Sequence, residues 1–306
     1  MTSLPGGSVL ITGASTGIGR ATAMLLDEKG MRVFAGVRRE ADAERLRADG
    51  SARMTPVIID VTDEIGIAKA RDQVAAVLGD YGLDGLVNNA GITVPGPLEY
   101  LPLADFRRQL EVNVVGQVAV TQAFLPLVRK ARGRIVFVGS IGGRVASPMI
   151  GAYNASKFAL EAIADTLRQE LRPWGIDVAI VEPGSIATPI WDKGRASADE
   201  LEARLPAEAK QRYAPMIDAV RAYTADAEER GLPPDRVAEA IAHAIRAKRP
   251  QTRYLVGTDA RLQAAIGALA PDRLFDRLVA MQLKLPASAP ADAPEPIMRD
   301  EPTGVA

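Results

Sequence analysis

Cysteine is absent from this sequence of 306 residues, and histidine occurs once, as His243. Without cysteine the protein can form no disulfide bond, no thiol nucleophile and no Cys-ligated zinc site. His243 lies in the alanine-rich run Val-Ala-Glu-Ala-Ile-Ala-His-Ala-Ile, so we expect it on a helix surface or in packing. The sequence therefore predicts a protein without a metal centre.

Net charge and long apolar runs are scarce as well. The net charge is −1 and the mean hydropathy is +0.02, which predicts a soluble globular protein with no basic surface for nucleic acid. No run of 18 apolar residues indicates a membrane span. The first strand is expected by residue 8 with no basic segment before it, so we expect no signal peptide and a cytoplasmic location.

Short apolar runs alternate with helical stretches along the chain. This alternation predicts an α/β fold: a Rossmann-type, doubly wound parallel sheet of about seven strands with helices on both faces. The apolar runs are mostly continuous, as expected when helices cover both faces of a parallel sheet. Strands are expected at 9–11, 32–35, 55–59, 85–88, 134–138, 177–181 and 254–256. Helices are expected at 18–29, 41–49, 64–79, 103–130, 153–171 and 233–248.

Residues 1–285 are expected to form a single domain, with one segment outside the alternating pattern. Residues 189–231 are charged and alanine-rich, and their apolar residues fall near helical spacing, which predicts one or two amphipathic helices. They could form a lid over a substrate or a surface insertion with no role in catalysis. The tail 286–306 is rich in proline, alanine and acidic residues, so we expect it to be disordered.

The segment Thr12 to Gly19 is rich in glycine and small residues, and it separates an apolar strand from a helical stretch. Glycines at such a turn allow the backbone to approach a pyrophosphate closely, and the helix N-terminus then presents free N–H groups. The spacing is Gly-x-x-x-Gly-x-Gly. Strand, turn and helix together predict a dinucleotide site.

Tyr153 and Lys157 are four residues apart and share one face of the expected helix. A phenol has a pKa near ~10, and lowering it to about 7 requires roughly 4 kcal/mol. An ammonium about 4 Å away supplies that much at an effective dielectric of ~20. The spacing therefore predicts a general acid/base, although a Tyr and a Lys on an ordinary helix would look the same.

These motifs, in this order, resemble those of the short-chain dehydrogenase/reductase family. The resemblance covers roughly residues 8–260 and is closest to its retinol, hydroxysteroid and 3-hydroxybutyrate dehydrogenase branch. It is carried by the motifs Thr12 to Gly19, Asp60-Val61, Asn88-Asn89-Ala90-Gly91, Asn113, Ser140, Tyr153 with Lys157, and Pro183-Gly184. It implies an oxidoreductase that transfers a hydride between a nicotinamide cofactor and an alcohol or carbonyl.

Four catalytic residues follow from the resemblance. It implies that Tyr153 exchanges a proton with the substrate oxygen and that Lys157 lowers the pKa of Tyr153 and holds the nicotinamide ribose. Ser140 would hydrogen-bond the substrate oxygen, and Asn113 would support a water near Lys157 or bend its helix. A serine-hydrolase reading of Ser140 fails because Val138 stands where Gly-x-Ser-x-Gly requires glycine, and no second histidine is available.

The resemblance also implies the cofactor contacts. The glycine loop would hold the pyrophosphate, Asp60 and Val61 the adenine, and the segment after the fourth strand the adenosine ribose. The residues implied are Gly13, Ala14, Ser15, Thr16, Gly17, Ile18, Gly19, Asp60, Val61, Asn89, Ala90, Gly91, Tyr153, Lys157, Pro183, Gly184, Ile186 and Thr188.

The choice of nicotinamide depends on the end of the second strand. A site for NAD places an acid there to bind the ribose 2′-OH. Here the position is Val37, followed by Arg38 and Arg39, which suit a 2′-phosphate. NADP is therefore expected, with NAD possible through Glu40.

The candidate substrate contacts are largely apolar, which favours a lipophilic alcohol or ketone. Besides Ser140 and Tyr153 they are Val145, Met149, Ile190 and Trp191. Arg144 could instead anchor the carboxylate of a small hydroxy acid, or be structural.

Three hypotheses stay open: an NADP-dependent oxidoreductase of lipophilic alcohols and ketones, an NAD-dependent hydroxy acid dehydrogenase, and a non-enzymatic nucleotide sensor. In this family the helices at 103–130 and 153–171 pair across subunits, so we expect a homodimer or homotetramer.

Overall fold

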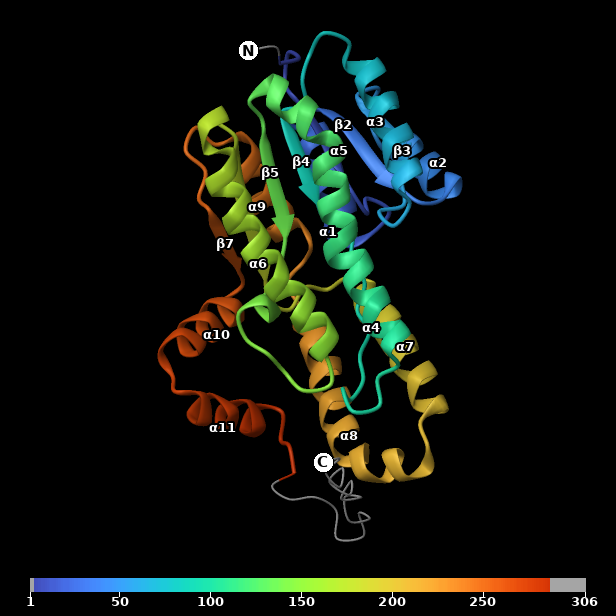
Figure 1. Ribbon diagram of the computed structural model, residues 1–306, viewed down its shortest axis with the longest axis vertical. Helices are drawn as coiled ribbons and strands as arrows, with labels where there is room; N and C mark the ends of the chain where they lie inside the picture. The colour runs from blue at the N-terminus through green and yellow to red at the C-terminus, as the bar shows by residue number, and fades with distance from the viewer. Residues whose placement is uncertain (1–2, 287–306) are drawn as a thin grey trace, which may run out of the picture.

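Seven parallel strands form one sheet in the computed structural model, which describes residues 3–286 (Figure 1). Their order is β3-β2-β1-β4-β5-β6-β7, so the direction of winding reverses between β1 and β4. This order confirms the predicted doubly wound fold. The strands are β1 (Ser8–Ile11), β2 (Arg32–Val37), β3 (Met54–Ile58), β4 (Gly85–Asn88), β5 (Arg134–Val138), β6 (Asp177–Pro183) and β7 (Arg253–Val256).

Helices cover both faces of the sheet because successive residues of each strand point to opposite sides. In β1, Val9 and Ile11 pack into one core cluster, whereas Leu10 packs into the other. The first cluster is closed by α1 (Gly17–Glu28), α2 (Glu40–Asp49) and α9 (Asp235–Arg246). The second is closed by α3 (Glu64–Leu78), α5 (Gly116–Ala131) and α6 (Gly151–Leu171). Burial on both faces explains why the strands are continuous apolar runs.

One long helical segment runs from Leu103 to Ala131 and contains an irregularity. It consists of α4 (Leu103–Leu110), the π-helical turn η1 (Glu111–Val115) and α5. By length and composition it could cross a membrane, since an 18-residue window has a mean hydropathy of 1.2. However, Val120, Phe124 and Val128 are fully buried against the sheet. The absence of a membrane span stays a prediction.

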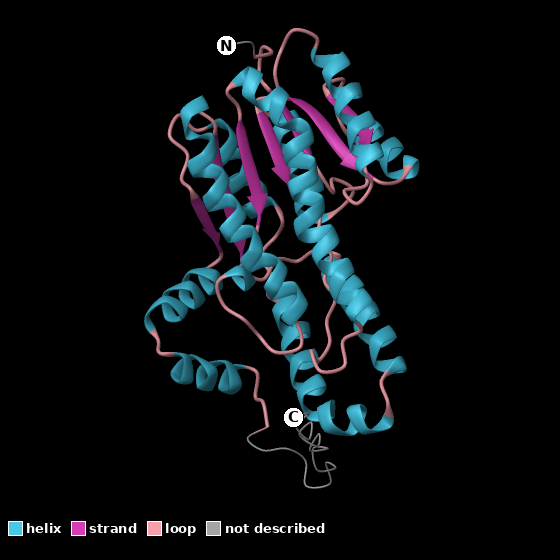
Figure 2. Ribbon diagram, in the orientation of Figure 1, coloured by secondary structure: helices cyan, strands magenta, loops and turns pink. Residues whose placement is uncertain are grey.

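The segment expected to be a lid forms two helices beyond the carboxyl ends of the strands (Figure 2). They are α7 (Ile190–Arg204) and α8 (Ala207–Glu229), so the predicted helical character of 189–231 is confirmed. Leu201 and Leu205 of this segment pack on Val94 in a third apolar cluster. The Tyr213 hydroxyl of α8 donates to Glu99 at 2.7 Å. Apolar packing and polar links therefore both tie this lid segment to the loop after β4.

Two further helices follow β7, at positions where the sequence predicted no element. They are α10 (Thr258–Leu269) and α11 (Asp272–Gln282), and they also lie beyond the carboxyl ends of the strands (Figure 1). The tail 286–306 was expected to be disordered, and residues 287–306 lie outside the described part of the chain.

Candidate active site

One cavity of about 850 Å³ joins the glycine loop, the Tyr153–Lys157 pair and the lid segment. It lies where parallel α/β sheets bind ligands, because its walls include the segments that follow β1, β2, β4, β5 and β6. Of the residues expected to bind cofactor or substrate, all but Ala14 and Met149 line it.

The glycine loop has the geometry of a phosphate cradle. Gly13 and Gly17 have φ values of 67° and 54°, a region that favours glycine. A Cβ on Gly19 would lie 2.3 Å from the Gly13 carbonyl oxygen, so no larger residue fits there. The N-cap residue of α1, Thr16, forms no side-chain capping bond to the first N–H groups of the helix. These groups can therefore bind a pyrophosphate oxygen.

Ala14 is a correction to the expected cofactor contacts. It is fully buried and does not line the cavity. Its N–H donates to the Gly36 carbonyl at 2.9 Å, which joins the glycine loop to β2. This bond removes the donor that a phosphate would need.

Asn89 and Ala90 hold the loop after β4 against the glycine loop. The Asn89 amide donates to the carbonyl oxygens of Thr12 and Gly13 at 2.9 and 3.1 Å. The backbone N–H groups of Asn89 and Ala90 donate to the Thr12 hydroxyl at 3.0 and 3.1 Å. Asn89, Ala90 and Gly91 line the cavity, so they both brace the strand ends and face the expected adenosine ribose.

The two arginines after β2 differ in their surroundings. The Arg39 guanidinium donates to both carboxylate oxygens of Asp42, at 2.9 and 3.2 Å. In residues 3–286, Arg38 forms no ion pair. Burial raises the pKa of Asp60, but hydrogen bonds from Thr62 and, to a smaller extent, the charge of Arg38 lower it overall. Arg38 is therefore the better placed of the two to bind an anion near Asp60.

Ser140, Tyr153 and Lys157 meet between β5 and α6. Ser140 accepts from the Gly142 N–H at 3.0 Å, and a Cβ on Gly142 would lie 3.4 Å from both Ser140 Oγ and Tyr153 Cε1, so the two side chains are neighbours. The Lys157 ammonium lies 5.6 Å from the centroid of the Tyr153 ring and donates to the Val138 carbonyl at 2.8 Å. The helical spacing thus brings the pair together as predicted.

The protonation of this pair differs from the expectation. Burial raises the pKa of Tyr153, an effect that its hydrogen bond to Ser140 only partly opposes. Burial also lowers the pKa of Lys157 to about 8, while the nearby Glu161 carboxylate raises it. The expected net lowering of the Tyr153 pKa is not seen because burial has the larger effect, and the Lys157 ammonium donates to the Val138 carbonyl. At neutral pH the phenol is a proton donor.

Asn113 lies in the π-helical turn η1 and is fully buried. Its amide accepts from the Ile92 N–H at 2.8 Å and donates to the Ile92 carbonyl and to the Ser156 hydroxyl, both at 3.0 Å. From this π-helical turn, the Asn113 side chain therefore joins the loop after β4 to α6. Such turns are common at functional sites.

The loop after β6 closes over the glycine loop. A Cβ on Gly17 would lie 3.2 Å from Thr188, which shows how closely the two loops approach. The Trp191 indole N–H donates to the Ile186 carbonyl at 2.7 Å and so fixes the start of α7. Asp259 of α10 accepts from the Ser185 N–H at 2.8 Å. Pro183, Gly184, Ile186 and Thr188 all line the cavity, as expected.

Three of the four apolar residues expected to contact the substrate lie in the cavity wall. Val145, Ile190 and Trp191 line the cavity. Met149 does not: it lies in a loop with a φ of 68°, and its carbonyl accepts from the Gly96 N–H at 2.6 Å. Arg144 is paired with Glu182 at 2.7 Å, which favours a structural role over a carboxylate anchor.

Part of the cavity wall was not expected from the sequence. It comes from α10 and α11, whereas α8 belongs to the segment expected to be a lid. The missed signal was the helical spacing of apolar residues between 262 and 283. The wall residues from this part of the chain are Asp259, Gln263, Ile266, Phe275, Leu278, Val279, Gln282 and Leu283, and α8 adds Val220, Arg221, Tyr223 and Thr224.

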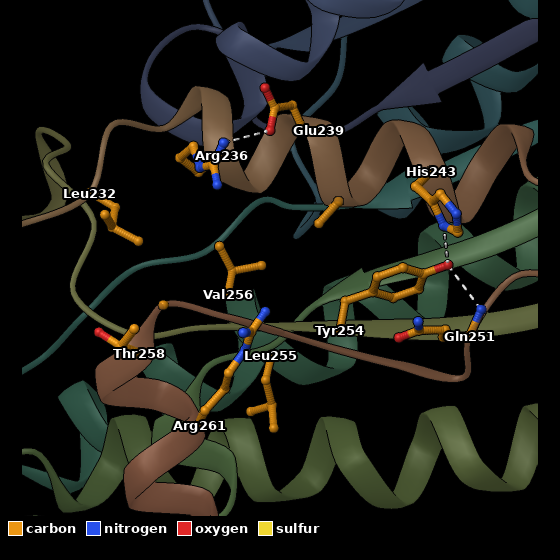
Figure 3. A pocket seen from close by; sticks show the side chains of 12 residues that line it. Leu232, Arg236, Glu239, His243, Gln251, Tyr254, Leu255, Val256, Thr258 and Arg261 are labelled. Atoms are coloured by element: carbon orange, nitrogen blue, oxygen red, sulfur yellow. Dashed lines mark hydrogen bonds and ion pairs between the residues drawn. The ribbon is translucent and has the colours of Figure 1, made fainter.

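A second cavity, of about 540 Å³, lies at the sheet edge between α9, β7 and α10 (Figure 3). The Tyr254 hydroxyl lies 2.9 Å from His243 Nδ1 and accepts from the Gln251 N–H at 2.9 Å. Arg236 pairs with Glu239 at 3.2 Å. Several of its polar groups thus satisfy one another, and His243 has the helix-surface position expected of it. Among residues 3–286 no cluster of histidine and carboxylate side chains could hold a metal ion.

Comparison with known proteins identifies the family. Residues 8–199 match the family described as short chain dehydrogenase. Human retinol dehydrogenase 16 is 40% identical over 286 residues, 92% of this chain and 90% of that protein. Bos taurus 17-beta-hydroxysteroid dehydrogenase type 6 is 39% identical over 291 residues, with the same coverage of 92% and 90%. The NADPH-dependent 3-dehydrocapnine reductase of Ornithobacterium rhinotracheale is 34% identical over 280 residues, 90% of this chain and 96% of that protein.

Solved structures agree with this assignment. A short-chain dehydrogenase/reductase from Burkholderia phymatum in complex with NAD is 26% identical, with a TM-score of 0.73 over 95% of this chain and 99% of that chain. A short-chain dehydrogenase from Burkholderia cenocepacia in complex with NADP is 26% identical, with a TM-score of 0.67 over 90% and 99%. The chain belongs to the short-chain dehydrogenase/reductase family, close to its retinol and hydroxysteroid dehydrogenases, and is an oxidoreductase acting on CH–OH groups with a nicotinamide cofactor.

Proposed function

We propose that the protein is an NADP-dependent oxidoreductase of lipophilic secondary alcohols and ketones, such as steroid-like or retinoid-like compounds, with Tyr153 as its general acid/base. The observation that carries the proposal is the single cavity that the glycine loop, Ser140, Tyr153 and Lys157 share with apolar side chains of α7, α8, α10 and α11. Apolar walls with a few convergent polar groups suit a ligand of this class.

The roles of the polar groups follow from their contacts. Tyr153 is the proton donor to a substrate carbonyl oxygen, since burial keeps its phenol protonated at neutral pH. Ser140, which lines the same cavity beside Tyr153, orients that oxygen. Lys157 supplies a positive charge that favours the phenolate when the proton leaves. Asn113 keeps the loop after β4 and α6 in register.

A nicotinamide cofactor fits the residues present. The glycine loop and the N-terminus of α1 would hold the pyrophosphate, and Asp60 with Val61 would contact the adenine. Pro183, Gly184, Ile186 and Thr188 would surround the nicotinamide, whose chemistry when bound is hydride transfer. Arg38 would bind a 2′-phosphate, which favours NADP over NAD. The NADPH dependence named for one relative supports the same choice.

The two other hypotheses have less support. The cation considered as the anchor of a small hydroxy acid, Arg144, is held by Glu182 and does not line the cavity. A nucleotide sensor would not need a serine and a lysine beside a buried phenol. A homodimer or homotetramer and a cytoplasmic location remain predictions.

The test is turnover of alcohols and ketones of graded size with NADP(H) and NAD(H). Tyr153→Phe should abolish turnover and leave cofactor binding nearly intact, because only the proton-transfer group is lost. Tyr223→Phe is the matched control, since its hydroxyl lies in the same cavity and accepts from Gln282 at 3.1 Å. Near-normal activity of Tyr153→Phe would reject the assignment of Tyr153. Turnover confined to small hydroxy acids would reject the substrate class.

A further inference from the structure

A cluster of charged side chains lies one helical turn beyond Lys157. Glu161 and Asp165 come from α6, Glu182 from β6 and Arg253 from β7. Arg253 pairs with Glu161 at 3.0 Å, with Asp165 at 2.8 Å and with Glu182 at 3.3 Å. Arg144, at the end of the short helix η2 (Ile141–Gly143), pairs with Glu182 at 2.7 Å. The side chain of Glu182 is fully buried, an unusual position for a carboxylate.

Glu161 and Glu182 share the Arg253 guanidinium, at 3.0 and 3.3 Å, and within the described residues Glu161 Oε1 and both carboxyl oxygens of Glu182 are buried without a hydrogen bond. Two ionised carboxylates are acceptors only, so a proton on one of the two supplies the donor that these oxygens lack. Burial raises the pKa of Glu161 to about 7, with Glu182 adding to the rise, and burial also raises the pKa of Glu182. The positive charges of Arg144 and Arg253 lower both pKa values and so oppose the effect of burial. One proton shared by the two carboxyl groups accounts for both their burial and their raised pKa values.

The carboxyl pair is connected to the catalytic segment through the backbone. A Cβ on Gly143 of η2 would lie 2.8 Å from the Lys157 carbonyl oxygen and 3.4 Å from Glu161 Cγ. The residue that begins η2 is Ser140, whose side chain accepts from Gly142. Arg144 ties the other end of η2 to Glu182. The cluster therefore fixes the contact between the segment carrying Ser140 and the helical turn carrying Lys157.

The pair also acts on Lys157 through charge. Residues four apart on a helix are neighbours, so the Glu161 carboxyl faces the Lys157 ammonium. The negative charge of Glu161 favours the protonated lysine, whereas burial opposes it. How much charge Glu161 carries thus determines whether Lys157 stays protonated.

We propose that Glu161 and Glu182 are positioning residues that share one proton and, clamped by Arg144 and Arg253, hold Lys157 in place beside a partial negative charge. This proposal rests on the proposed role of Lys157. The charged groups facing Glu161 are Lys157 and Asp165 on its own helix, Arg144 after η2, Glu182 on β6 and Arg253 on β7. Charged residues also lie on α4, η1 and the 3-10 helix η3 (Arg172–Trp174), the other elements packed on α6. Within the described residues, none of these charged side chains forms an ion pair with the cluster. They are Asp105, Arg107, Arg108, Glu111 and Arg172.

The test measures the titration of Lys157 by NMR of the full chain with carbon-13-labelled lysine, with Lys157→Met to identify its signal. Glu161→Gln should move the Lys157 midpoint to lower pH by about one unit or more, because an opposite charge is removed. Glu182→Gln should not lower the midpoint, because Glu161 then keeps its full charge. Glu170→Gln, on the exposed end of the same helix, is the matched control and should leave the midpoint unchanged.

Two results would overturn the proposal. One is a Lys157 midpoint in Glu161→Gln equal to that in Glu170→Gln; the other is an equal fall in Glu161→Gln and Glu182→Gln. If the variants fail to fold, the wild-type protein with labelled glutamate carboxyl carbons gives the answer. One carboxyl should then titrate near pH 7, and titration of every glutamate between about 4 and 5 would refute the shared proton. None of these measurements needs turnover, so they can fail while the proposed function stands.

Discussion

Replacing Arg38 should separate NADP from NAD binding, whereas replacing Arg39 should not. The two arginines are neighbours with the same charge, and both line the cavity. Arg39 is committed to Asp42 through hydrogen bonds of 2.9 and 3.2 Å, and the Asp42 side chain is only 4% exposed. Arg38 has no such partner in the described residues.

The expected magnitude follows from these contacts. A charge-assisted hydrogen bond to a phosphate is worth about 1.5–3 kcal/mol. Arg38→Ala should therefore weaken NADPH binding by roughly 10-fold to 150-fold and NADH binding much less, since only NADPH has the 2′-phosphate. Arg39 would have to leave Asp42 to bind a phosphate, so Arg39→Ala should change NADPH affinity by less than about 3-fold.

Fluorescence titration of the two reduced cofactors against wild type and both variants is the assay. The ratio of the two dissociation constants is the quantity to compare, because a general loss of fold would affect both cofactors. Tighter binding of NADH than NADPH by the wild type would refute the NADP assignment. A larger effect of Arg39→Ala than of Arg38→Ala would refute the argument from the Asp42 contacts.

Three further predictions concern stability, the lid segment and assembly. The pKa of Lys157 is lowered from 10.5 to about 8, so below pH 8 the buried charge lowers stability, and stability rises as pH increases from 8 to 10.5. Lys157→Met should thus raise the free energy of unfolding at pH 7 by up to about 3 kcal/mol and remove that rise, and urea unfolding showing a less stable variant at pH 7 would contradict this. Tyr213→Phe removes the bond to Glu99 and should speed amide exchange in the lid segment; unchanged exchange would show that apolar packing alone holds it. Phe158 is 43% exposed on α6, so Phe158→Asp should shift a dimer or tetramer toward monomer in light scattering, and a wild-type monomer at micromolar concentration would remove the expectation of an oligomer.

The sheet could be predicted from the sequence because its strands are buried on both faces. A continuous apolar run such as Val9–Ile11 has few alternatives once a glycine turn and a helix follow it. The observed strand bounds differ from the predicted ones by up to two residues, as for β2, which continues to Val37. That extension places Arg38 and Arg39 immediately after the strand, at the position where a site for NAD differs from a site for NADP.

The helices α10 and α11 were missed for a physical reason. Their apolar residues do not pack into the main core, and Leu262, Leu269, Leu274 and Met281 are largely exposed. In the described structure α11 has no buried residue at all, and its other apolar side chains line the cavity instead. The sequence of a helix that lines a cavity has neither the apolar pattern of a core helix nor the polar pattern of a surface helix.

The catalytic pair shows where helical spacing stops being informative. The spacing of four correctly brought Tyr153 and Lys157 together, but it could not show that the ammonium is directed at the Val138 carbonyl. Nor could it show that Glu161, four residues further, shares Arg253 with Glu182 of strand β6. Both contacts depend on how β5 and β6 lie beneath α6, which is a property of the assembled sheet.

The departures from ordinary packing rules gather in one region. A π-helical turn, a buried lysine and a fully buried glutamate each lower stability when considered alone. In this protein they occur around Asn113, Lys157 and Glu182, on three elements that meet beside the cavity. The sheet and the helices that pack on it follow local rules closely enough to be predicted from the sequence. Departures confined to one place are expected where function, rather than stability, selects the residues, and this supports the placement of the active site at α6 independently of any motif.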